Sequence, residues 1–196
     1  MIAAFGASAC AAEPEQVERS PSETEAKDAQ GLPRGDGYVR ARLSGTLSRE
    51  LDWSNEGTEC TGAIRPTDGG VRLRFSRFDE TSASKLVLVF GIASLREGHA
   101  AKSLPVNVTI IREGAGEFYS TQGDDKCTLD SIDQQPIVGV PFRSRSYRVV
   151  ARGFCTEPAR AVRGKGAVLL SRFDFAGRID FESEDETEDD PVMAQQ

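Results

Sequence analysis

The fold is decided by Leu86-Val87-Leu88-Val89-Phe90-Gly91-Ile92, the longest uninterrupted apolar run in the chain. As a helix, this run would be far too short to cross the roughly 30 Å hydrocarbon layer of a bilayer. Its β-branched and aromatic side chains favour a strand, and the lack of polar alternation predicts burial on both faces. We therefore predict a central β-strand over about residues 85–93.

Shorter segments on both sides show the alternation that is typical of strands with one buried face. In residues 38–43, three apolar side chains alternate with Arg40 and Arg42. A hairpin is predicted for residues 59–77, because Asp-Gly-Gly at 68–70 separates two alternating runs. Further strands are expected at 106–111, 118–121, 127–132, 147–155 and 167–181, with Gly177 as a candidate bulge.

These strands lie close together in the sequence, and no helical pattern exceeds two turns. The pattern predicts an all-β fold, a single antiparallel β-sandwich or barrel-like domain of about 8–9 strands. The patterned region is long enough to bury about two-thirds of the surface that its unfolded chain exposes.

The first ten residues are mostly small or apolar and end in Ala7-Ser8-Ala9-Cys10. This start resembles the end of a bacterial export signal, and its last four residues resemble the lipobox of bacterial lipoproteins. The resemblance implies that cleavage makes Cys10 the first residue and that its sulfur carries a diacylglycerol. Ala11 is not the Asp that this family associates with inner-membrane retention, so an outer-membrane address is implied. Ala7-Ser8-Ala9 also fits an ordinary secretion site, and an unprocessed chain is a third alternative.

The composition divides the chain into an export-signal remnant (1–9), a tether (10–36), the β domain (37–181) and an acidic tail (182–196). The tether is rich in Glu, Pro, Ser and Gln, so we expect it to be disordered, as we do the self-repelling tail. The whole chain has a net charge of −7, but the β domain carries 21 Lys/Arg against 17 Asp/Glu, a net +4. A basic sheet face could therefore meet an anionic surface.

The cysteines of the β domain predict one disulfide. If the strand that begins at Cys127 pairs antiparallel with the strand that ends at Cys155, paired residue numbers sum to 282. This register puts the connection near residues 139–142, which contain a Gly and a Pro, and places the two thiols opposite each other. We predict a Cys127–Cys155 disulfide and a buried, free Cys60, with pairs that involve Cys60 as the alternative.

The sequence contains no recognisable catalytic set. His99 is the only histidine, lies in a predicted loop and has no nucleophile pattern nearby. Cysteine spacing for zinc and glycine motifs for nucleotides are absent, so no metal, no cofactor and no catalytic residue is predicted. The acidic residues around Cys127 lack the spacing of a calcium loop, which favours turn caps and a solvated loop; they are Asp124, Asp125, Asp130 and Asp133.

We interpret the chain as a non-catalytic cell-envelope lipoprotein, a binding or scaffolding β domain on a lipid tether. Its expected partners are the membrane, through the lipid anchor, and an unidentified protein or other envelope ligand. Nucleic acid is not expected, because the acidic, exported chain lacks a basic–aromatic platform. Two alternatives stay open: a secreted or periplasmic enzyme such as a carboxylate-based hydrolase, and a soluble exported binding module.

Overall fold

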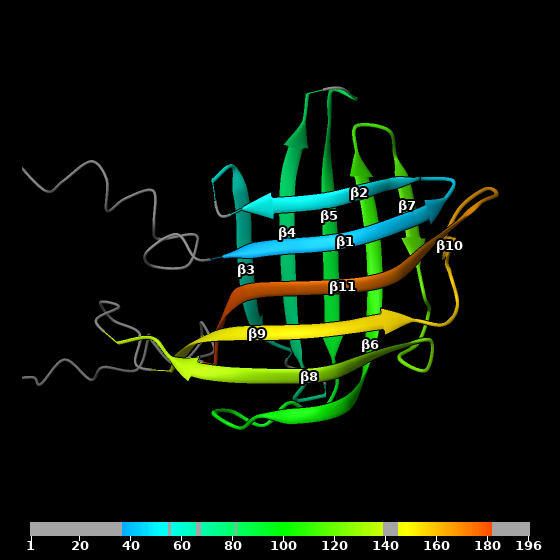
Figure 1. Ribbon diagram of the computed structural model, residues 1–196. Coiled ribbons are helices and arrows are strands. Elements are labelled where there is room, and N and C mark those ends of the chain that lie inside the picture. Colours follow the sequence, from blue (N-terminus) through cyan, green and yellow to red (C-terminus); the bar gives the residue numbers. More distant parts are fainter. Residues whose placement is uncertain (1–36, 55, 66–67, 81, 139–144, 182–196) are drawn as a thin grey trace, which may run out of the picture.

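The computed structural model describes residues 37–54, 56–65, 68–80, 82–138 and 145–181, and those residues form strands, turns and loops (Figure 1). The predicted export signal, tether and acidic tail lie outside the described residues. In the part that is described, no helix is long and apolar enough to cross a membrane. The strands are β1 (Tyr38–Gly45), β2 (Arg49–Ser54), β3 (Thr58–Ile64), β4 (Val71–Asp79), β5 (Ser84–Ile92), β6 (Ala101–Glu113), β7 (Glu117–Ser120), β8 (Cys127–Pro136), β9 (Ser146–Cys155), β10 (Ala159–Ala161) and β11 (Ala167–Asp180).

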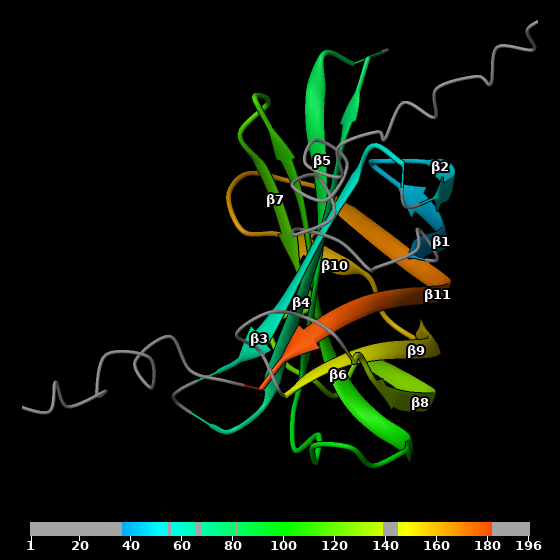
Figure 2. The ribbon, with the colours of Figure 1, turned by 90° about the vertical axis from the view of Figure 1, so that its left-hand side faces the viewer.

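The strands form two layers that cross at a steep angle. One layer contains β3, β4, β5, β6 and β7, and the other contains β2, β1, β11, β9 and β8 (Figures 1 and 2). Three strands join the layers: β6 pairs with both β5 and β8, β10 pairs with both β7 and β11, and β11 meets β3 through one parallel pair, Asp180 with Ala63. Seven strands (β3, β4, β5, β6, β8, β9 and β11) therefore close into a barrel, and β1, β2, β7 and β10 extend it. The predicted all-β, barrel-like domain is confirmed.

The strand β6, which joins the layers at one corner, changes its partner from β8 to β5 between Pro105 and Val106. Ser103 has a positive φ of 55°, and the ladder to β8 skips it between the pairs Lys102–Ser131 and Leu104–Leu129. The register is the same on both sides of Ser103, so the ladder is interrupted there without an extra residue. The change of partner lets the first part of β6 follow one layer and the rest follow the other.

The predicted bulge at Gly177 is wrong. Gly177 pairs in continuous register with Val149 of β9, and the irregularity of β11 lies instead at Ser171, which the ladder to β1 skips. A Cβ atom on Gly177 would lie 2.8 Å from the Phe75 ring and 2.9 Å from the Cys60 sulfur. The glycine is therefore needed for close packing against the core rather than for an extra residue.

The core lies between the two layers and is centred on four phenylalanines. Phe75 and Phe90 come from the first layer, and Phe173 and Phe175 come from β11 in the second. Phe90 packs with ring centroids 5.0 Å from Phe173 and 4.7 Å from Phe175. Each large buried side chain of this kind contributes about 1.5–3 kcal/mol through removal from water.

The predicted central strand is confirmed as β5, which lies between β4 and β6. Its inward-facing side chains are buried in the core, and the outward-facing Val87 is fully buried as well. Arg74 of β4 and Glu113 of β6 form an ion pair of 3.2 Å across the outer face of β5. This ion pair lies over the outward-facing side chains of β5 and shields them from water, so an apolar run without polar alternation suits this position.

The structure joins Cys127 and Cys155 in a disulfide, and Cys60 is free and buried, as the sequence predicts. The first three pairs of β8 with β9 have the expected sum of 282, beginning with Cys127 opposite Cys155. A bulge between Leu129 and Ser131 then shifts the register by one residue. The predicted connection near residues 139–142 lies outside the described residues.

Candidate functional site

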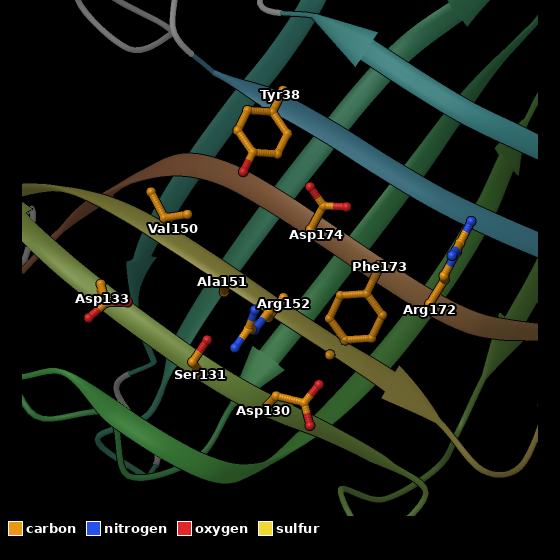
Figure 3. A pocket seen from close by; sticks show the side chains of 11 residues that line it. Tyr38, Asp130, Ser131, Asp133, Val150, Ala151, Arg152, Arg172, Phe173 and Asp174 are labelled. Atoms are coloured by element: carbon orange, nitrogen blue, oxygen red, sulfur yellow. The ribbon is translucent and has the colours of Figure 1, made fainter.

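The candidate site is an open groove on the outer face of the second layer, with a volume of about 680 Å³ (Figure 3). It runs across four neighbouring strands, β1, β11, β9 and β8, and its lining combines outward-facing side chains with three buried residues, Ala151, Gly153 and Phe173. The lining residues are Tyr38, Asp130, Ser131, Asp133, Val150, Ala151, Arg152, Gly153, Arg172, Phe173 and Asp174.

Strand register places a row of charges across this face. Arg40 lies opposite Asp52 of β2 on one side and Asp174 of β11 on the other, and Asp174 lies opposite Arg152 of β9. Arg40 forms ion pairs with both acids, at 3.2 Å to Asp52 and 3.6 Å to Asp174. Its guanidinium also lies 4.7 Å from the centre of the Tyr38 ring, a cation–π contact. Through these contacts Arg40 lies beside two residues that line one wall of the groove, Tyr38 and Asp174.

The opposite wall is shaped by the bulge in β8. Because the ladder skips Asp130, the consecutive residues Asp130 and Ser131 both line the groove. Figure 3 shows their side chains on β8 near Arg152 of β9. The bulge therefore places a carboxylate and a hydroxyl beside a guanidinium.

Two arginines of the groove have no ion-pair partner among the described residues, namely Arg152 and Arg172. Both are exposed, as is Asp133 at the far wall. Guanidinium, carboxylate and hydroxyl groups together offer donors and acceptors to a polar ligand. Because the groove contains both positive and negative side chains, it does not favour a strongly anionic or a strongly cationic ligand.

The residues that the sequence singled out do not gather in this groove. Cys10 lies outside the described residues, and the Cys127–Cys155 disulfide lies at one end of the β8–β9 ladder, buried toward the core. His99 is exposed in a loop, where its Nδ1 is 2.7 Å from the Glu97 carbonyl oxygen. Across the described segments, no three His, Cys, Asp or Glu side chains are arranged to hold a metal ion.

The electrostatics of several groups disfavour catalysis by them. Burial raises the pKa of the Cys60 thiol to about 11, so it stays protonated and non-nucleophilic. A hydrogen bond from Arg42 lowers the pKa of Glu50, and hydrogen bonds from Lys85 and Ser76 lower that of Glu59. A general acid needs the opposite shift. These two carboxylates therefore stay ionised near neutral pH.

Sequence reasoning missed the groove but contained part of its signal. The alternation of residues 38–43 already turns Arg40 to the surface, and the alternation of residues 147–155 does the same for Arg152. No local pattern shows that β1, β11 and β9 are neighbours, and that adjacency creates the groove.

Comparison with protein-family models, with characterised proteins and with solved structures finds no match for this chain.

Proposed function

We propose that this chain is a non-catalytic cell-envelope lipoprotein, in which a lipid on Cys10 holds a binding or scaffolding β domain at the outer membrane. The disulfide between Cys127 and Cys155 carries the proposal, because such bonds persist in oxidising compartments outside the cytoplasm. The lipobox-like sequence at residues 7–10 supports lipid attachment at that place.

The tether gives the domain freedom of position. Residues 11–36 would span about 25–30 Å on average as a flexible chain. Two or three acyl chains on Cys10 would anchor the protein stably, since each buried methylene contributes about 0.8 kcal/mol. The domain would thus stay within a short distance of the bilayer and still rotate to meet a partner.

We assign partner binding to the groove on the second layer. It is open, extends across four strands, and combines Tyr38 with charged and hydroxyl groups (Figure 3). Such a lining fits a protein or another envelope ligand with many hydrogen-bonding groups. The packed phenylalanine core between the layers supports binding at the surface rather than inside the barrel.

Metabolic labelling with a palmitate analogue tests the anchor. We expect the wild type to be labelled, Cys10→Ser to be unlabelled, and Cys60→Ala to be labelled like the wild type, because Cys60 is buried in the folded domain. In membrane fractionation, the wild type and Cys60→Ala should remain with the membrane, and Cys10→Ser should not. If the wild type and Cys10→Ser label equally poorly, the lipid anchor is wrong, and release without detergent would identify a soluble exported module instead.

A further inference from the structure

A short apolar strip crosses the β7–β10 edge of the barrel on its outer face. Ile111 of β6 lies opposite Phe118 of β7, and the Val162 amide donates a 2.9 Å hydrogen bond to the Phe118 carbonyl oxygen. Phe118 is 47% exposed and Val162 is 53% exposed. Figure 2 shows the loop that follows β10 beside β7 at the margin of the barrel. Two large apolar side chains therefore face solvent side by side.

Three cations border this strip. Arg160 of β10 lies opposite Ser120 of β7, next to the Phe118 position, and Arg163 and Lys165 follow Val162 in the turn to β11. All three are exposed, and none forms an ion pair with another described residue. Residues 157–166 contain these three cations and one acid, Glu157, a net charge of +2.

The two acids of the neighbouring β6–β7 hairpin, Glu113 and Glu117, already form ion pairs. Arg112 pairs with Glu117 at 3.0 Å, and Arg74 pairs with Glu113 at 3.2 Å. Because both glutamates are already paired, they do little to neutralise the cations beside the strip. The edge combines exposed apolar side chains with unpaired positive charge, the combination that binds an anionic lipid–water interface.

We propose that the strip of Ile111, Phe118 and Val162, with Arg160, Arg163 and Lys165, docks the barrel on an anionic bilayer surface. Charge complementarity favours lipid headgroup phosphates. The strip is also much smaller than the roughly 20–30 residues a side of a specific protein interface. The proposal rests on the proposed envelope location, where a short tether supplies an effective concentration in the mM range and so makes weak docking sufficient.

Vesicle sedimentation of the full-length chain with Cys10→Ser tests docking without the lipid anchor. The probe is phosphatidylcholine vesicles with or without about one-third phosphatidylglycerol. We expect binding only to the anionic vesicles, although the chain as a whole has a net charge of −7. Because this measurement excludes the anchor, it fails or succeeds independently of palmitate labelling.

Matched variants locate the contact. Each cation near an anionic bilayer contributes about a five-fold gain in partitioning, so Arg160→Gln/Arg163→Gln/Lys165→Gln should lower binding about a hundred-fold. The control Arg72→Gln/Arg96→Gln/Lys102→Gln removes the same charge from exposed positions away from the strip and should retain far more binding.

A second pair of variants tests the apolar part of the strip. Phe118→Ser should weaken binding several-fold, whereas Phe78→Ser, which alters a side chain that is 59% exposed elsewhere, should not. Thermal unfolding checks that every variant folds. Equal binding to both vesicle types, or equal losses in the strip and control variants, would overturn the proposal. So would a dimer that Phe118→Ser dissociates in the absence of vesicle binding, because the strip would then bind a second copy of the chain.

Discussion

Opening the Cys127–Cys155 disulfide should lower the free energy of unfolding by about 3.6 kcal/mol. The bond joins residues that are 28 apart in sequence. In the chain-entropy model, a loop of this length restricts the unfolded chain by about 12 cal/mol/K, which gives about 3.6 kcal/mol at 25 °C. The folded state should change little, because the ladder between β8 and β9 continues beyond the bond as far as Pro136.

Urea unfolding measures this difference directly. The wild type is compared with and without dithiothreitol, so that no side chain is truncated and only the bond is broken. Cys127→Ala/Cys155→Ala is the matched control, and its free energy of unfolding should not respond to the reductant. Cys60 is free in both proteins and cannot replace the missing bond.

The result that would refute the reasoning is a wild type whose free energy of unfolding changes by less than about 1 kcal/mol on reduction. An equal response of the double variant would be just as damaging, because it would assign the effect to something other than this bond. Alkylation of Cys127 in the folded wild type without reductant would show that the bond is absent.

Three further predictions follow from individual contacts. Gly177→Ala should destabilise the protein by about 1–3 kcal/mol in urea unfolding, because the new methyl group meets the Phe75 ring at 2.8 Å; an unchanged midpoint would show that the core has room there. Iodoacetamide at about pH 8 should label Cys60 only after unfolding, since burial raises its pKa to about 11; rapid labelling of the folded chain would contradict that burial. Thr121→Val should cost about 1–3 kcal/mol, because the Thr121 hydroxyl accepts the Val108 N–H at 3.1 Å, whereas Thr121→Ser keeps that bond; equal losses in the two variants would refute this reason.

Local patterns were sufficient for the strands whose sequence carries a clear burial signal. β5 lacks alternation and is buried, and β1 alternates with its arginines outside. The hairpin of β3 and β4 follows its Asp-Gly-Gly turn. In each case the side-chain pattern and the backbone preference agree, and this agreement is what makes a segment predictable from sequence.

Elements that depend on tertiary contacts were missed. β10 has three residues, Ala159–Ala161, and exists because it bridges β7 and β11. The first part of β6 contains Pro105, which is uncommon inside a sheet, and Ser103 with a positive φ, and it is held by pairing with β8. Barrel closure through a single parallel pair to β3 has no local sequence signal at all.

The candidate site was predictable only as a set of outward-facing residues. Alternation shows that Arg40, Arg152 and Asp174 leave the core, but it does not show that they share one row. That row requires the order β1–β11–β9 and a register that is fixed by the core. The bulge at Asp130 adds a second wall, and a bulge without a glycine leaves little trace in the sequence.

The sign and grouping of the charges differ between the groove and the β7–β10 edge, and this difference separates the roles proposed for the two surfaces. In the groove, charges of both signs lie close together, since Arg152 and Arg172 line it with Asp130, Asp133 and Asp174. Beside the groove, Arg40 pairs with Asp52 and Asp174. Such a surface can discriminate among polar ligands by hydrogen-bond geometry, which salt weakens little at short range. At the β7–β10 edge, Arg160, Arg163 and Lys165 form a group of a single sign that has no ion pair with another described residue, and they lie beside exposed apolar side chains. Their attraction to a charged surface acts over a longer range and needs no fixed geometry, so it should decline steeply with ionic strength. Selective recognition therefore belongs to the groove, and orientation against a bilayer belongs to the edge.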